Sequence, residues 1–92
     1  MTVRRVWKYV LRKPQQLVEM PAGATLLHVA ADPASLNPAV WAEVDPEADK
    51  VVRRLAVVMT GEPFDSEGLR HIGTAFITEL GIVAHVYEAD PS

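Results

Sequence analysis

Apolar and polar residues alternate with period two along most of the chain, which is the pattern of β-strands that have one face in a core. The clearest example runs from Val3 to Leu11, where Trp7, Tyr9 and Leu11 fall on one face. Lys13-Pro14 ends this stretch, because proline has no N–H to donate to a strand ladder. We therefore expect a first strand whose aromatic residues anchor the core.

The same alternation predicts six further strands, separated by turns rich in Pro, Gly, Asn and Asp. They cover Gln16 to Met20, Thr25 to Ala31, Ala39 to Val44, Lys50 to Met59, Ile72 to Ile77, and Ile82 to Tyr87. Both alternating sets of residues in the 25–31 strand are largely apolar, which favours a central place in a sheet. In the 39–44 strand, Trp41 shares a face with Glu43, so we expect this tryptophan on the wetter side.

The last two strands are expected to form a hairpin around Thr78-Glu79-Leu80-Gly81, in which Gly81 supplies the positive φ that a short loop needs. Both faces of this hairpin are mostly apolar. We therefore expect it to be covered on both sides, by the rest of the chain or by a second copy.

A helix over residues 66–80 competes with the first strand of this hairpin. The apolar residues of the segment also recur at helical spacing: Leu69, Ile72, Phe76, Ile77 and Leu80. Gly73, Thr74 and Thr78 disfavour the helix by about 1–2 kcal/mol. The pattern therefore favours the strand.

The preferred fold is all-β and mainly antiparallel, with about seven short strands in one globular domain over residues 1–92. A small sandwich, a partly closed barrel and a strongly curved sheet all fit this pattern. The alternative is an α+β fold with a helix at about 66–80.

Composition narrows the class of protein further. There is no cysteine, so a disulfide framework or a thiolate site is excluded. Uninterrupted apolar runs are far shorter than the roughly 20 residues that span a bilayer. Trp7, Lys8 and Tyr9 interrupt the N-terminal region where a signal peptide would have its apolar segment. We expect a cytoplasmic protein.

Charge is distributed unevenly around a net value of −3. Five basic residues precede the first acidic one, Glu19, and most of the acidic residues follow in the connections and the last third. Such asymmetry either attracts charged partners or is satisfied within the protein. We favour a basic first strand that faces acidic residues of the same chain or of a second copy.

Motifs for phosphate binding, nucleophilic catalysis, dinucleotide binding and metal binding are absent from the sequence. We therefore assign no catalytic residue, no cofactor and no metal. The three histidines, His28, His71 and His85, are expected to be half-buried and hydrogen-bonded. The alternative is a small ligand-binding protein or metal-dependent enzyme that uses His28, His85 and an acid.

Six residues are candidates for binding: Trp41, Glu43, His85, Tyr87, Arg53 and Arg54. Trp41 with Glu43, or His85 with Tyr87, would suit a ligand pocket. Arg53-Arg54, together with Arg4-Arg5 and Trp7, would suit a nucleic acid through phosphate contacts and stacking. The acidic net charge argues against this last partner.

Several segments together resemble a family of small uncharacterised proteins encoded mainly by actinobacteriophages and related prophages. They are Trp7-Lys8-Tyr9, Met20-Pro21-Ala22-Gly23-Ala24, Ile72-Gly73-Thr74 and His85-Val86-Tyr87-Glu88. The resemblance covers nearly the whole chain. It implies an accessory protein made in the cytoplasm of an infected bacterium, and it implies no activity.

The function expected from the sequence is therefore a non-enzymatic protein-binding module. It would contact a host or phage protein, or a second copy of itself, through a sheet edge or an aromatic face.

Overall fold

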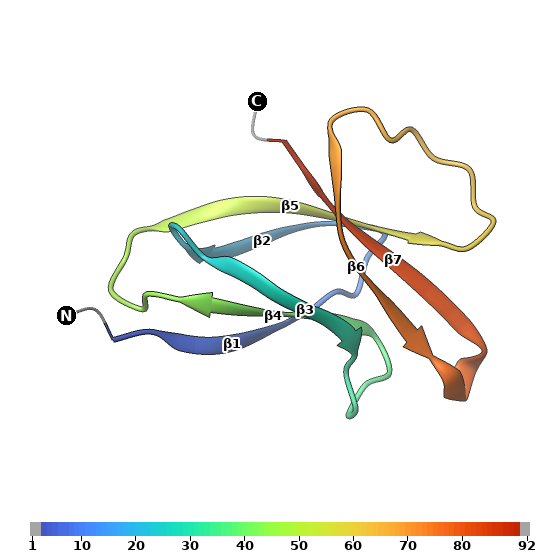
Figure 1. The fold of residues 1–92 in the computed structure, drawn as a ribbon, viewed down its shortest axis with the longest axis horizontal. Coiled ribbons are helices and arrows are strands. Elements are labelled where there is room, and N and C mark those ends of the chain that lie inside the picture. The colour runs from blue at the N-terminus through green and yellow to red at the C-terminus, as the bar shows by residue number, and fades with distance from the viewer. Residues whose placement is uncertain (1–2, 91–92) are drawn as a thin grey trace.

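Two antiparallel sheets make up the computed structural model, which describes residues 3–90 (Figure 1). The strands are β1 (Arg5–Val10), β2 (Gln15–Pro21), β3 (Thr25–Ala31), β4 (Pro38–Val44), β5 (Lys50–Met59), β6 (Leu69–Ile77) and β7 (Ile82–Ala89). The first sheet has the order β1-β4-β3 and the second has the order β2-β5-β7-β6. The all-β prediction is confirmed, and the arrangement is a small sandwich without a closed barrel.

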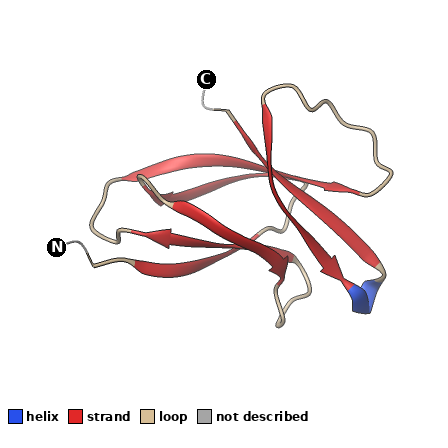
Figure 2. Cartoon of the chain, in the orientation of Figure 1, coloured by secondary structure: helices blue, strands red, loops and turns tan. Residues whose placement is uncertain are grey.

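The alternative helix at 66–80 is wrong. Residues 69–77 form β6, and only the short 3-10 turn η1 (Thr78–Leu80) is helical in this segment (Figure 2). Alternation decides the outcome, because Ala75 and Ile77 on one side of β6 are buried while Phe76 between them is exposed. Gly81 ends η1 with a φ of 65°, as the predicted hairpin loop requires.

The core lies between the sheets and is built from small and branched apolar side chains. Its members are Leu11, Val18, Met20, Ala24, Val29, Val40, Ala42, Val44, Leu55, Val57, Ala75, Ala84 and Val86. Trp7 and Tyr9 pack against this cluster from β1, as their place on one alternating face of the strand predicts. The fourth strand also follows its pattern, because Trp41 lies opposite the buried face.

The expectation that residues 25–31 form a central strand was wrong. β3 is not central, because it forms an edge of the three-stranded sheet. An irregularity between Leu26 and His28 also leaves the Leu27 side chain 50% exposed. The described chain covers the β6–β7 hairpin on one face, and Phe76 on the other face is 67% exposed, so coverage of that face by a second copy stays a prediction. Apolar residues on both faces of a short strand therefore did not indicate that both faces are buried.

The two sheets approach each other closely where β3 meets β6. A Cβ atom added at Gly73 would lie 2.8 Å from Val29 Cγ2 and 2.9 Å from Val29 Cβ. On the other side, the chain passes between the sheets through residues 11–14. There the Leu11 N–H donates to the Pro38 carbonyl at 2.8 Å, and the Val57 N–H donates to the Pro14 carbonyl at 2.8 Å.

Two basic residues in and beside the first strand are paired with acidic residues of the same chain. Arg4 Nε lies 2.6 Å from Glu43 Oε2, and Lys8 Nζ lies 2.6 Å from Asp32 Oδ1. The interpretation of the charge asymmetry as self-complementary is confirmed for these two pairs. Residues 3–90 contain no helix of the length and apolarity needed to cross a membrane.

Candidate functional site

Trp41 and Glu43 lie on the outer face of the three-stranded sheet. Trp41 sits between Lys8 of β1 and His28 of β3 in the strand register. Its ring centroid is 6.1 Å from that of His28. Glu43 is paired with Arg4, so Trp41 and Glu43 form a packed surface on which the carboxylate already has a partner.

His85 and Tyr87 lie together on the outer face of the four-stranded sheet. Thr74 Oγ1 is 3.1 Å from His85 Nδ1 and 3.2 Å from His71 Nε2, while Thr60 Oγ1 is 2.7 Å from His85 Nε2. The Tyr87 ring centroid is 5.2 Å from that of His71. The structure thus joins two histidines through a threonine, which the sequence analysis did not anticipate.

The three histidines do not converge. His28 lies on the three-stranded sheet, whereas His71 and His85 are on the outer face of the other sheet. Within residues 3–90, no three His, Cys, Asp or Glu side chains gather closely enough to hold a metal ion. The alternative enzyme that combines His28 with His85 therefore has no common site in this fold.

Arg53 and Arg54 point to opposite sides of β5. The Arg53 side chain lies between the sheets and is 18% exposed, while Arg54 is exposed on the other face. The two arginines therefore do not share one face of β5. Arg53 belongs instead to a network that lies inside the sandwich.

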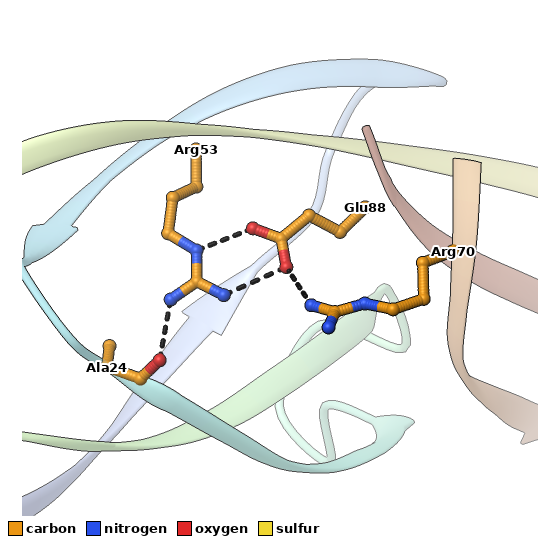
Figure 3. A network of polar contacts seen from close by, with 4 residues as sticks. All are labelled: Ala24, Arg53, Arg70 and Glu88. Atoms are coloured by element: carbon orange, nitrogen blue, oxygen red, sulfur yellow. Dashed lines mark hydrogen bonds and ion pairs between the residues drawn. The ribbon is translucent and has the colours of Figure 1, made fainter. Parts of the chain in front are cut away.

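This network joins two arginines through one buried carboxylate (Figure 3). Arg53 donates from Nε to Glu88 Oε2 at 2.5 Å and from Nη2 to Glu88 Oε1 at 2.8 Å. Its Nη1 donates to the Ala24 carbonyl at 2.6 Å, which ties the four-stranded sheet to the start of β3. Arg70 donates from Nη2 to Glu88 Oε1 at 2.8 Å.

The network leaves one positive charge in excess. The hydrogen bonds from Arg53, followed by those from Arg70, lower the pKa of Glu88 despite its burial. The two guanidinium groups therefore face a single ionised carboxylate. The Arg70 side chain is 68% exposed and makes one of these contacts, so most of its five N–H donors are open to solvent.

Two cavities meet at this arginine pair. The larger, of about 610 Å³, lies between the first half of β5 and the end of β7 and is lined by Leu17, Gly23, Val51, Val52, Arg53, Arg54, Arg70, Glu88, Ala89 and Asp90. The smaller, of about 420 Å³, lies between β3 and β6 and is lined by Ala24, Thr25, Leu26, Arg53, Arg70, His71 and Ile72. Arg53 and Arg70 therefore contribute to both.

The first half of β5 has a free edge beside the larger cavity. β2 pairs with β5 from Lys50 to Ala56, but β7 pairs with it only from Leu55 to Met59. On the β7 side, no strand of the described residues pairs with 50–54. Figure 1 shows the end of β7 diverging from β5 at this point.

The strand ladder determines which backbone groups face this opening. The Val57 N–H points toward β2, where it donates to Pro14, and the Thr60 N–H points toward β7, where it donates to Val83. Backbone groups of an antiparallel strand alternate between its two sides. The N–H and C=O groups of Val52 and the N–H of Arg54 therefore point into the open edge, while the pairing of Leu55 with Glu88 uses the Arg54 carbonyl.

Sequence reasoning identified Arg53 but missed Glu88 and Arg70. A signal was present in the alternation. Arg53 shares its side of β5 with Leu55 and Val57, and Glu88 shares its side of β7 with Ala84 and Val86. Opposite charges on the apolar faces of two strands indicate a buried pair, because an unpaired charge there is costly.

Acid pH is expected to destabilise the fold through two carboxylates. The Lys8 and Ser35 hydrogen bonds lower the pKa of Asp32 to about 2, and the pKa of Glu88 is also lowered. The pKa values of both carboxyls are lower in the folded chain than in the unfolded chain, so the unfolded chain binds more protons in acid. The free energy of unfolding therefore decreases as the pH is lowered. We expect a stable plateau at neutral pH and a decline between about pH 4 and pH 2.

Urea unfolding followed by tryptophan fluorescence over this pH range measures the decline. An Asp32→Asn variant is expected to show a shallower dependence than the parent protein. A free energy of unfolding that stays constant from pH 5 to pH 2 would contradict the assignment.

One family model matches the chain, and it spans residues 2–92 under the description "Domain of unknown function (DUF7352)". No curated protein and no solved structure matches the chain.

Proposed function

We propose that this chain, which belongs to the DUF7352 family of domains of unknown function, is a non-enzymatic protein-binding module. In this proposal an extended segment of a partner protein adds as a strand to the open half of β5. The observation that carries the proposal is the unpaired edge at residues 50–54 beside the larger cavity. An unpaired edge offers N–H and C=O groups as a template for another strand, and proteins use this mode to recognise peptides.

The lining of the cavity indicates the chemistry of the partner. Val51, Val52 and Leu17 are 40%, 61% and 64% exposed and provide apolar contacts. The charged lining consists of three arginines and two carboxylates, Glu88 and Asp90. An apolar segment that carries negative charge complements this surface.

A second copy of the chain fits this edge less well. If two β5 strands paired through the same edge, each would bring Lys50 and Arg54 toward the cations of the other. Like charges at facing positions of a strand pair are destabilising. Charge therefore favours a different, acidic partner over self-association.

The cellular setting is a separate part of the proposal and rests on the resemblance of the sequence segments alone. In this part, the chain is a phage or prophage accessory protein that acts on a host or phage protein in the bacterial cytoplasm. Of the alternatives, nucleic-acid binding loses support because Arg53 is engaged by Glu88 inside the sandwich.

The test uses an N-acetylated hexapeptide of alternating valine and threonine with a free C-terminal carboxylate. Titration into the 92-residue chain, followed by amide NMR, is expected to shift the Val52 and Arg54 resonances and to slow exchange of their N–H groups. Such protection is what new backbone hydrogen bonds at the open edge produce.

Two variants at one position provide the matched comparison. Val52→Pro removes the N–H at the open edge without touching the ladder to β2, and proline is compatible with a strand edge. We expect it to weaken peptide binding at least tenfold, whereas Val52→Thr retains binding. Shifts confined to another surface, or equal affinities for the two variants, would overturn the proposal.

A further inference from the structure

We propose that Arg70 receives the C-terminal carboxylate of the bound segment, an inference that rests on the proposed function. The strand edge determines where the segment lies. The arginine pair determines where the segment ends and in which direction it runs.

The open edge is closed at one end by the chain itself. Pairing with β7 begins at Leu55, which lies opposite Glu88, and Ala89 and Asp90 line the same cavity. A guest strand bonded to Val52 and Arg54 therefore meets β7 just beyond Arg54. It has to end or turn there, because the next place in the sheet is already occupied.

Charge selects which end of the guest lies at this closed end. β5 runs from Lys50 toward Leu55, so a guest parallel to β5 has its C-terminus beside the arginines. A guest that runs the other way would place its N-terminal end there, where the excess charge is already positive. The parallel orientation, with a carboxylate at the closed end, is the favourable one.

Arg70 is the receiving residue, and Arg53 and Glu88 position it. Arg53 is largely buried and already donates from all three of its nitrogens, to Glu88 and to Ala24. Arg70 donates from one nitrogen to the same carboxylate and is 68% exposed. A second carboxylate can therefore bind the remaining donors of Arg70 while Glu88 holds its side chain in place (Figure 3).

The experiment compares three forms of the hexapeptide on the same protein: the free acid, its C-terminal amide, and an amide with one internal aspartate. We expect amidation to weaken binding at least tenfold, and the internal aspartate not to restore it. Arg70→Gln is expected to weaken binding of the free acid to the level of the amide and to abolish the difference between them. Arg12→Gln, at an exposed arginine on the β1–β2 connection, serves as the control and retains both affinities.

The outcomes separate this inference from the proposed function. If the amide binds as tightly as the acid and Val52→Pro still weakens both, the strand-addition function stands and the role of Arg70 is wrong. If the internal aspartate restores full affinity, recognition is of an acidic side chain and the terminal assignment is wrong. If no peptide binds, the proposed function fails. Circular dichroism and thermal midpoints of the Arg70→Gln and Arg12→Gln variants establish that both remain folded.

Discussion

Replacing Glu88 by alanine is expected to lower the free energy of unfolding by about 3 kcal/mol, a large share of the stability of a small domain. The reason is that Arg53 would remain between the sheets without its bidentate partner, and a partly buried charge without a counter-ion is costly. Urea unfolding at neutral pH measures the loss. Glu67→Ala, at an exposed position in the β5–β6 loop, is the matched control and is expected to change stability by less than about 0.5 kcal/mol.

A double variant identifies the cause of this loss. Arg53→Met combined with Glu88→Leu removes both charges and keeps apolar volume between the sheets, so we expect it to recover most of the stability lost in Glu88→Ala. If Glu88→Ala costs no more than Glu67→Ala, the network makes no contribution to the fold. If the double variant is no more stable than the single one, packing rather than charge explains the loss.

Gly73→Ala is expected to destabilise the protein by about 1–3 kcal/mol, because the added methyl group would force β3 and β6 apart. The clash is with the Cγ2 and Cβ atoms of Val29, and the Cβ atom is bonded to the backbone, so no change of side-chain rotamer moves it away. Thermal and urea unfolding measure the change. In a Val29→Gly background, which lacks both clashing atoms, we expect the same substitution at Gly73 to cost much less.

The two substitutions therefore form a double-mutant cycle across the β3–β6 contact. Residues in contact give a coupling energy, whereas independent sites give additive effects. Additive losses would show that the contact between Gly73 and Val29 does not limit the approach of the sheets.

Local features of this fold could be predicted from the sequence because local rules determine them. The period-two pattern located all seven strands to within a few residues of their observed ends. The turn at Gly81 and the inward side of β1 followed from backbone conformation and from alternation. Each of these depends on residues that are neighbours in the chain.

Features that join distant parts of the chain could not be predicted in this way. Nothing local indicates that β1 pairs with β4 or that β5 lies between β2 and β7. Gly73 was interpreted as a residue that disfavours a helix. A side chain is excluded at this position because Val29, on another strand, lies too close. Arg53-Arg54 was interpreted as one basic pair, although adjacent residues of a strand face opposite sides.

The contacts that join Arg53, Glu88 and Arg70 were missed for the same reason, although the alternation places a charge on the apolar face of β5 and of β7. Arg53 and Glu88 are 35 residues apart, and Arg70 reaches Glu88 only because β6 and β7 are paired. The stretch of unpaired edge on β5 is equally invisible in the sequence, because it results from the different lengths over which β2 and β7 accompany this strand.

Arg53 and its counter-ion Glu88 are 35 residues apart in the sequence, so Arg53 is synthesised well before its partner. Synthesis from the N-terminus produces β2 and β5 before β7, so this ribbon is complete while one entire side of β5 still lacks a neighbour. Topologies in which distant strands pair fold slowly, and exposed edges of nascent chains are prone to aggregate. A ribosome-bound chain that has not yet reached Glu88 therefore exposes the edge of β5 to aggregation.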